Sequence, residues 1–136
     1  MHENKQVVVR FLEALGQADI PALAGLMAPG SVAICTGTCA LSGSRGRETI
    51  LGTAGLLKQV TKNGIRFHIV SMTAEDDRVS AEMRGECELV NGAVYNNEYH
   101  FLFTVKDGQI TMMKEYLDTR MVDDILAPLF ASAMAG

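Results

Sequence analysis

The C-terminal half of the chain alternates between apolar and polar residues in three stretches that two tight turns connect. The stretches cover residues 79–89, 93–105 and 110–117. Alternation with a period of two is typical of a β-strand with one buried face. Asn91-Gly92 and Asp107-Gly108 supply residues that tolerate a positive φ, as short hairpin turns require. The pattern predicts an antiparallel meander of strands.

Helical periodicity dominates the N-terminal half. Apolar residues recur every three or four positions over residues 5–16, and a glycine ends that pattern. Asp19 can cap a second, short helix that carries Pro21 in its first turn. A third helix is predicted over residues 47–60, and a closing helix over residues 123–131.

Two further strands complete the expected sheet. Residues 31–36 and 65–70 are predicted strands, whereas residues 37–46, rich in glycine and serine, are predicted to form a loop. Three N-terminal helices and an antiparallel meander define an α+β fold in which a curved sheet packs its concave face on the helices. A chain of 136 residues has the size of one domain, so we expect a single domain over residues 1–136.

The composition argues against several classes of partner. A net charge of -4 without any run of Lys or Arg gives no footprint for nucleic acid or an anionic membrane surface. The longest apolar run, residues 125–136, contains Pro128 and is shorter than the roughly 20 residues that span a bilayer. The N-terminal residues show no signal-peptide pattern, and three cysteines favour a reducing compartment, so we expect a cytoplasmic protein.

A carboxylate stands inside the last apolar strand. Residues two apart in a strand share a face, so Glu115 lies in one row with Met113 and Leu117. Burial raises the pKa of a carboxyl group, by up to roughly 3–5 units when it is complete. Such a group can act as an acid or a base near neutral pH. Glu115 is therefore a candidate catalytic residue, and Met113 and Leu117 are candidate substrate contacts.

Two other predicted strands carry polar groups that can join the same pocket. Arg84 and Glu86 project together from residues 79–89. If their face meets the cavity of Glu115, the guanidinium favours the ionised carboxylates, while burial and mutual repulsion disfavour them. We therefore predict Arg84 and Glu86 as catalytic partners of Glu115. Residues that share one face of the next strand are predicted substrate contacts: Tyr95, Asn97, Tyr99 and Phe101.

The segment from Tyr99 to Ile110, leading to Lys114-Glu115-Tyr116-Leu117-Asp118-Thr119, resembles the nuclear transport factor 2-like superfamily. Within this superfamily the chain is most similar to SnoaL-like and ketosteroid isomerase-like proteins. The resemblance covers nearly the whole chain and implies a cone-shaped sheet, a cystatin-like α+β barrel. It also implies a homodimer formed through the exposed side of the sheet.

A partial resemblance to limonene-epoxide hydrolases rests on Arg84-Gly85-Glu86 and on Glu115 before Tyr116. Those enzymes carry an Arg-x-Asp pair on one strand and an Asp before an aromatic residue in the last strand. Here Glu replaces Asp at both places, which lengthens each arm by one methylene. The same hydrolases hold a water molecule with a Tyr and an Asn of the first strand, and residues 32–35 of this chain contain neither.

These observations predict a cofactor-independent enzyme that acts on a small apolar molecule by carboxylate acid/base catalysis, as a SnoaL-like isomerase, cyclase or epoxide hydrolase. The alternative is a non-catalytic module of the same fold that binds a small molecule or dimerises. His68 and His100 lie outside the pocket rows and lack the spacing of a metal site, so we expect no metal. Asp118 is predicted to cap the last helix. Cys35 and Cys39 are interpreted as small buried thiols.

Overall fold

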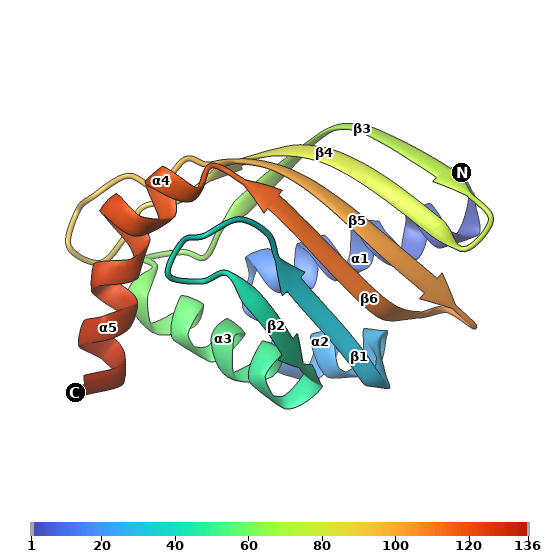
Figure 1. Ribbon diagram of the computed structural model, residues 1–136, viewed down its shortest axis with the longest axis horizontal. Coiled ribbons are helices and arrows are strands. Elements are labelled where there is room, and N and C mark those ends of the chain that lie inside the picture. Colours follow the sequence, from blue (N-terminus) through green and yellow to red (C-terminus); the bar gives the residue numbers. More distant parts are fainter. Residues whose placement is uncertain (1, 136) are drawn as a thin grey trace.

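A computed structural model describes residues 2–135, which form one six-stranded sheet with helices on its concave side (Figure 1). The strands are β1 (Met27–Cys35), β2 (Gly43–Gly46), β3 (Arg66–Glu75), β4 (Arg78–Glu86), β5 (Glu98–Lys106) and β6 (Gln109–Leu117). Their order across the sheet is β2-β1-β6-β5-β4-β3. Only β1 and β6 run parallel among the described strands, and the other neighbouring pairs are antiparallel.

Helices cover the concave face and one end of the sheet. They are α1 (Glu3–Gly16), α2 (Ile20–Leu26), α3 (Arg47–Val60), α4 (Thr119–Met121), the π-helical turn η1 (Val122–Leu126) and α5 (Ala127–Ala135). The first three lie against the concave side of the sheet (Figure 1). The C-terminal segment leaves the end of β6 and stands beside α3, where it closes that end of the molecule.

The core lies between the concave face and α1. Tyr99, Phe101 and Phe103 alternate along β5 with more exposed residues, so their rings all point inward. The ring of Phe103 meets that of Phe11 in α1 edge-on, with 5.7 Å between the ring centroids. Aromatic side chains bury about 150–250 Å² each. This contact fixes α1 against the centre of the sheet.

The α+β class and the packing of helices on a curved sheet are confirmed, but two segment predictions are wrong. Residues 43–46, predicted as loop, form β2 because they pair antiparallel with the end of β1. Residues 93–97, predicted as strand, lie outside β5, although Val94 forms an isolated antiparallel bridge with Glu88. The Asn97 side chain accepts a hydrogen bond from the backbone of Glu98, and side-chain bonds of this kind compete with a regular ladder.

The first strand also differs from its prediction. It begins at Met27 instead of residue 31 and runs parallel to β6, an arrangement that a simple meander does not contain. The register between the two strands shifts between Met27 and Val32, where Pro29 and Gly30 lie. Proline has no N–H to donate to a ladder, which explains why the strand continues past it only with an irregularity.

The end of α1 and the start of β3 are held in close contact by two glycines. The backbone N–H of Ile65 donates to the carbonyl of Gly16 over 2.8 Å. A Cβ atom on Gly16 would lie 2.2 Å from the Ile65 oxygen, and one on Gly64 would lie 2.0 Å from the Gly16 oxygen. Gly64 also has a φ of +73°, which side chains rarely allow. No other residue type fits either position without a shift of the backbone.

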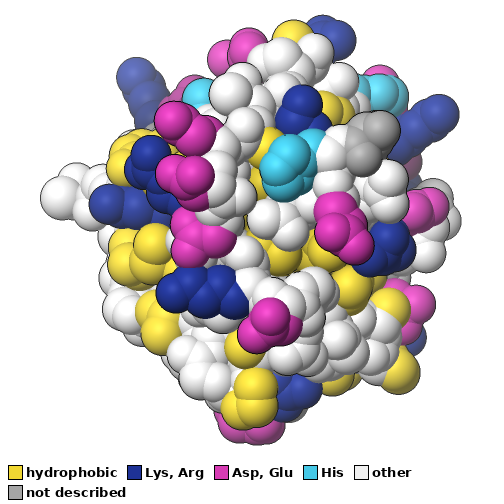
Figure 2. Space-filling model, turned by 90° about the vertical axis from the view of Figure 1, so that its right-hand side faces the viewer, with side chains coloured by type: hydrophobic (Ala, Val, Ile, Leu, Met, Phe, Trp, Pro, Cys, Tyr) yellow, Lys and Arg dark blue, Asp and Glu magenta, His cyan; other side chains and the backbone are white. Residues whose placement is uncertain are grey.

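The outer surface shows charges of both signs. On the face drawn in Figure 2, Lys and Arg side chains are interspersed with Asp and Glu, and no broad area of one sign stands out. Among residues 2–135 there is no helix whose length and apolar character would suffice to cross a membrane.

Candidate active site

A cavity of about 100 Å³ lies inside the cone, between the sheet and the helices. Its walls come from the inner face of the sheet, from α1 and α3, and from the C-terminal segment through Val122, Leu126 and Phe130. Most of the lining is apolar. The side chains that bring polar atoms to it are Arg45, Thr53, Tyr95, Tyr99 and Glu115.

Glu115 is the carboxylate of this cavity. It projects inward from β6, where its Cα pairs with Phe101 of β5 on one side and with Cys35 of β1 on the other. No side chain within residues 2–135 hydrogen-bonds to its carboxylate. Burial raises the pKa of Glu115 to about 7, although the positive charge of Arg45 pulls in the opposite direction. Near neutral pH the group therefore exists in both its acid and its base form.

Asn97 connects Tyr95 to the end of β6. Its Nδ2 donates to the Tyr95 hydroxyl over 2.9 Å and to the carbonyl of Asp118 over 3.1 Å. Its Oδ1 accepts from the backbone N–H of Glu98 over 2.7 Å and from that of Asp118 over 3.2 Å. Both ends of the amide are thus occupied inside the protein. Asn97 is 1% exposed and does not line the cavity, so the structure gives it a positioning role.

Tyr95 presents a hydroxyl whose proton is available to a ligand. Its oxygen accepts from Asn97 and also from the hydroxyl of Tyr99. Burial raises the pKa of Tyr99, and the bond to Tyr95 adds to the rise because it holds the donated proton in place. A phenol oxygen that accepts two bonds still has its own hydrogen to donate. Burial raises the pKa of Tyr95 to about 12, so this hydroxyl keeps its proton at neutral pH.

Arg45 is a cavity residue that the sequence analysis missed. It lies on β2, where its Cα pairs with Ala33, and its guanidinium donates to the carbonyl of Leu41. The residue was hidden inside a stretch of glycine and serine that was predicted to be a loop. The only signal was a single arginine ahead of a predicted helix, which does not show by itself which way the side chain points.

The predicted cavity partners Arg84 and Glu86 lie on the opposite face of the sheet, so the prediction of one shared pocket is wrong. In the register of β4 and β5, Arg84 pairs with Glu98, whereas Met83 pairs with Tyr99 on the inner face. Glu86 is exposed and contacts His68, with 2.8 Å between Oε2 and Nε2. That hydrogen bond lowers the pKa of Glu86 from its ordinary value. The alternating pattern shows which residues of one strand share a face. It does not show which faces of two different strands point to the same side of the sheet.

The remaining predicted substrate contacts do line the cavity. They are Tyr95, Tyr99, Phe101, Met113 and Leu117. These side chains share the inner face with Glu115 because Tyr99 pairs with Leu117, and Phe103 with Met113, across β5 and β6. Their contact with a substrate stays a prediction.

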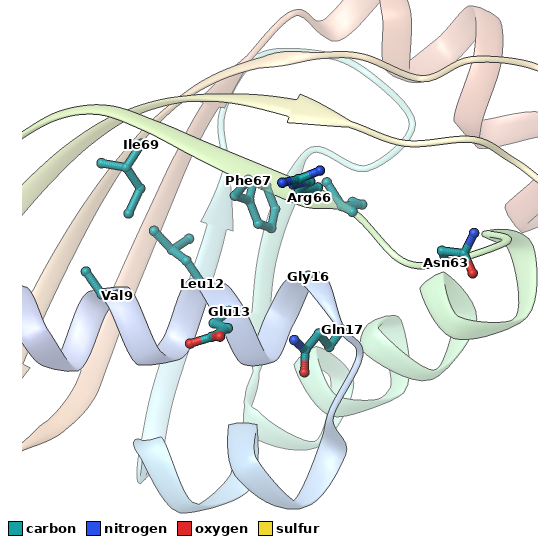
Figure 3. Close-up of a pocket in the computed structure, with 10 residues that line it drawn as sticks. Val9, Leu12, Glu13, Gly16, Gln17, Asn63, Arg66, Phe67 and Ile69 are labelled. Atoms are coloured by element: carbon teal, nitrogen blue, oxygen red, sulfur yellow. The ribbon is translucent and has the colours of Figure 1, made fainter.

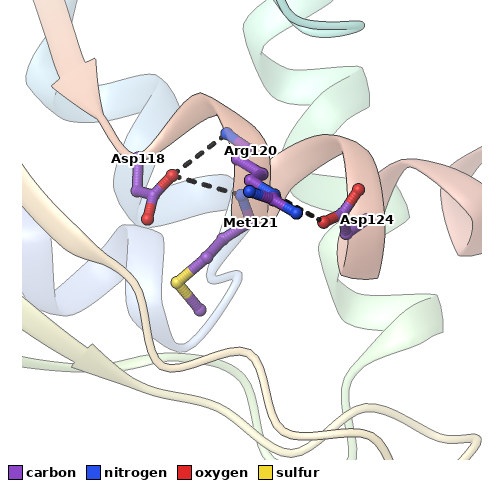
Figure 4. A network of polar contacts seen from close by, with 4 residues as sticks. All are labelled: Asp118, Arg120, Met121 and Asp124. Atoms are coloured by element: carbon purple, nitrogen blue, oxygen red, sulfur yellow. Dashed lines mark hydrogen bonds and ion pairs between the residues drawn. The ribbon is translucent and has the colours of Figure 1, made fainter.

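Asp118 caps the helical segment that follows β6, as predicted. Its Oδ1 accepts from the backbone N–H of Arg120 over 3.0 Å and from that of Met121 over 3.3 Å (Figure 4). Arg120 turns away and contacts Asp124 over 3.4 Å. The cap fixes where the C-terminal segment begins and therefore where it crosses the end of the cavity.

The thiols and histidines do not assemble a metal site. Cys35, Cys39 and Cys87 are buried and unpaired as disulfides, and burial raises the pKa of Cys35 to about 12 and that of Cys87 to about 11. Within residues 2–135 no group of three or more His, Cys, Asp or Glu side chains is arranged to hold a metal ion.

Comparison with protein families identifies the family of this chain. The model of the SnoaL-like domain matches residues 8–113. The chain belongs to the SnoaL-like domain family. No curated protein matches the chain. The match covers the helices and most of the sheet, including Arg45, Tyr95 and Tyr99, and ends two residues before Glu115.

Solved structures share the same fold. An NTF2-like protein from Burkholderia xenovorans LB400 is 22% identical, with a TM-score of 0.70 over 88% of this chain and 92% of its own. A protein assigned to the SnoaL-like polyketide cyclases from Jannaschia sp. CCS1 is 20% identical, with a TM-score of 0.71 over 89% and 90%. A protein with a ketosteroid isomerase-like fold from Catenulispora acidiphila DSM 44928, solved with trimethylamine, is 19% identical, with a TM-score of 0.70 over 81% and 83%.

Replacing Asn97 with alanine tests its positioning role. We expect Asn97→Ala to lower the free energy of unfolding by about 2–4 kcal/mol, because two backbone N–H groups and the Tyr95 hydroxyl lose buried partners. The control Asn96→Ala removes one exposed side chain that accepts from the Cys87 backbone, at a cost of about 1 kcal/mol. Urea unfolding of both variants measures the difference, and equal losses would contradict the role.

Proposed function

We propose that this SnoaL-like protein is a cofactor-independent enzyme that moves a proton on a small apolar substrate, with Glu115 as the acid/base residue. The observation that supports it is a single carboxyl group, with its pKa raised to about 7, in an apolar cavity beside the donating hydroxyl of Tyr95. A general base is most effective when its pKa lies near the working pH. An apolar cavity also strengthens each polar contact inside it.

The geometry supports proton transfer next to a carbonyl group. The ionised Glu115 removes a proton from the carbon beside the carbonyl, and the Tyr95 hydroxyl donates a hydrogen bond to the oxygen as negative charge develops there. Glu115 is then neutral and returns the proton to another carbon of the same molecule, which completes an isomerisation. If the enolate carbon attacks a second carbonyl within the substrate, the product is a ring, and Glu115 supplies the proton to the new alkoxide.

Isomerisation or cyclisation is favoured over epoxide hydrolysis. Epoxide opening by the resembled hydrolases uses an arginine and a second carboxylate around the water. In this protein Arg84 and Glu86 point outward, and the cavity contains Glu115 as its one carboxylate among the described residues. The guanidinium whose charge acts on Glu115 belongs to Arg45 on β2, the edge strand farthest from β3 and near the opposite end of the sheet from β4.

A non-catalytic binding module is the second candidate. The mostly apolar lining of the cavity favours it, because an apolar space can retain a ligand without chemistry. The two functions differ in one observable: proton exchange between a bound ketone and the solvent requires an acid/base group, whereas binding alone does not.

Hydrogen–deuterium exchange distinguishes these functions. In D₂O the wild-type protein is expected to exchange protons next to the carbonyl of small ketones, with a rate that rises with pH until about 7 as Glu115 ionises. Glu115→Gln should lower the rate by about 10³-fold, and Tyr95→Phe by about 10²-fold. NMR of the ketone signals measures the exchange.

The matched control is Glu86→Gln, which changes a carboxylate on the outer face. Its exchange rate should equal that of the wild type. Loss of exchange in this control, together with full exchange in Glu115→Gln, would contradict the assignment of the base. Absence of exchange from the wild type with a ketone that binds would leave the binding module as the function.

We also propose a homodimer through the outer face of the sheet. Half-buried apolar residues gather there, including Ile34, Leu102 and Met112. Tyr116 lies beside them and is 44% exposed. Register places Leu102 and Ile34 on either side of Lys114, so these apolar side chains flank one lysine, whose Nζ lies 5.8 Å from the centroid of the Tyr116 ring. Exposed apolar patches often mark interfaces between proteins.

The dimer has a direct test. Light scattering should give twice the chain mass of 14.7 kDa for the wild type. Met112→Glu should weaken association by at least about tenfold, because it buries a charge whose paired neighbours, Val32 and Thr104, supply no cation. Val94→Glu changes an exposed residue in the segment before β5 and should leave the dimer intact. A monomeric wild type at high concentration would contradict the proposal.

A further inference from the structure

The cavity around Glu115 is too small for a typical ligand. It measures about 100 Å³, whereas ligand sites in proteins usually enclose about 300–1,000 Å³. One water molecule occupies about 30 Å³ of the liquid, so the cavity has room for a group of only a few heavy atoms. It can hold the reacting carbonyl of a substrate with its immediate neighbours. The rest of the molecule needs another space.

A groove of about 530 Å³ runs outside the cavity, between α1 and β3 (Figure 3). Val9 and Leu12 of α1 and Ile69 of β3 form its apolar floor and sides. Glu13 of α1 and Arg66 of β3 also line it. Gln17 and Asn63 add two further polar side chains to the lining. The groove therefore offers an apolar strip for a hydrocarbon chain with polar groups beside it.

The groove and the cavity share two residues, Ile65 and Phe67. The Phe67 ring projects from β3 toward α1 (Figure 3). On its inner side it meets the rings of Tyr99 and Phe101, at centroid distances of 5.4 and 6.5 Å. The partition between the two spaces is thus one side chain thick at this point.

The side chain of Phe67 is the part of this partition that can move. At the closed end of the groove, the backbone contact between Gly16 and Ile65 leaves no room for α1 to slide. Phe67 itself is only partly buried and belongs to β3, the edge strand of the sheet. Rotation of its ring joins the cavity of about 100 Å³ to the open groove of about 530 Å³.

We infer that the protein takes an elongated ligand, whose carbonyl head lies in the cavity at Glu115 and Tyr95 and whose apolar tail passes Phe67 into the groove between α1 and β3. This inference rests on the proposed function only for the carbonyl head. The tail is a hydrocarbon chain, because Ile65 and Phe67 at the partition and Val9 beyond it are apolar. Phe67 is then the residue that sets the limit on substrate length.

Binding of unbranched methyl ketones, from butanone to 2-decanone, tests the inference by calorimetry. The affinity of the wild type should rise by about fourfold for each added methylene once the chain passes Phe67, because each methylene leaves water for an apolar groove. Phe67→Trp should abolish this rise and retain the binding of butanone. Val9→Trp fills the groove without touching the cavity, so it should also abolish the rise in affinity with chain length. This second variant keeps the test valid if Phe67→Trp does not fold.

The control is Val70→Ala, which alters an exposed β3 residue outside the groove and should leave all affinities unchanged. Equal affinity for short and long ketones, failure of every ketone to bind, or a normal length dependence in both tryptophan variants would each overturn the inference. Length-dependent binding without proton exchange would refute the proposed function alone. Exchange of butanone without length dependence would refute the inference alone.

Discussion

The burial of the Glu115 carboxyl group costs folding free energy, since an ionised carboxylate loses its hydration inside an apolar cavity. The pKa of Glu115 rises from its ordinary value near 4.5 to about 7, so the folded protein holds this proton more tightly than the unfolded chain does. Below about pH 4 the carboxyl group is protonated in both states and does not lower the free energy of unfolding. As the pH rises toward 7 this free energy falls, and above pH 7 it is lower by up to about 3 kcal/mol than at low pH. Such a cost is expected at a site where a tuned acid or base has a use.

Several rigid contacts hold the surroundings of that carboxyl group. Asn97 bonds both the Tyr95 hydroxyl and the backbone at Asp118, and Asp118 in turn caps the segment that closes the cavity. The donor, the end of β6 and the C-terminal segment are thus connected by one chain of hydrogen bonds. On the opposite side, Phe67 packs on Tyr99, so the wall toward the α1 groove touches the same tyrosine network. A substitution at Phe67 is therefore expected to affect Tyr95 through the ring of Tyr99, which lies between them.

The sequence predicted the fold well and the site in part, and the difference has a physical cause. Alternation placed Glu115, Met113 and Leu117 in one row, and the tight turn at Asp107-Gly108 carries β5 directly into β6, so Tyr99 and Phe101 followed correctly. The turn at Asn91-Gly92 sets Glu88 opposite Val94 and therefore Arg84 opposite Glu98. Alternation within a strand does not show which residues a turn sets opposite each other, so Arg84 and Glu86 were assigned to the wrong face. The position of Arg45 in the cavity could not be predicted from the sequence. Residues 43–46 have no alternating pattern, and they form β2 because they pair with β1.

The central claim is that Glu115 is a buried acid/base group that changes protonation near neutral pH. A ¹³C NMR titration of the side-chain carboxyl groups measures this directly, and the resonance missing from Glu115→Gln identifies the signal. We expect a titration midpoint near pH 7 for Glu115. A midpoint near 4.5 would show an ordinary, solvated carboxylate and would contradict the account.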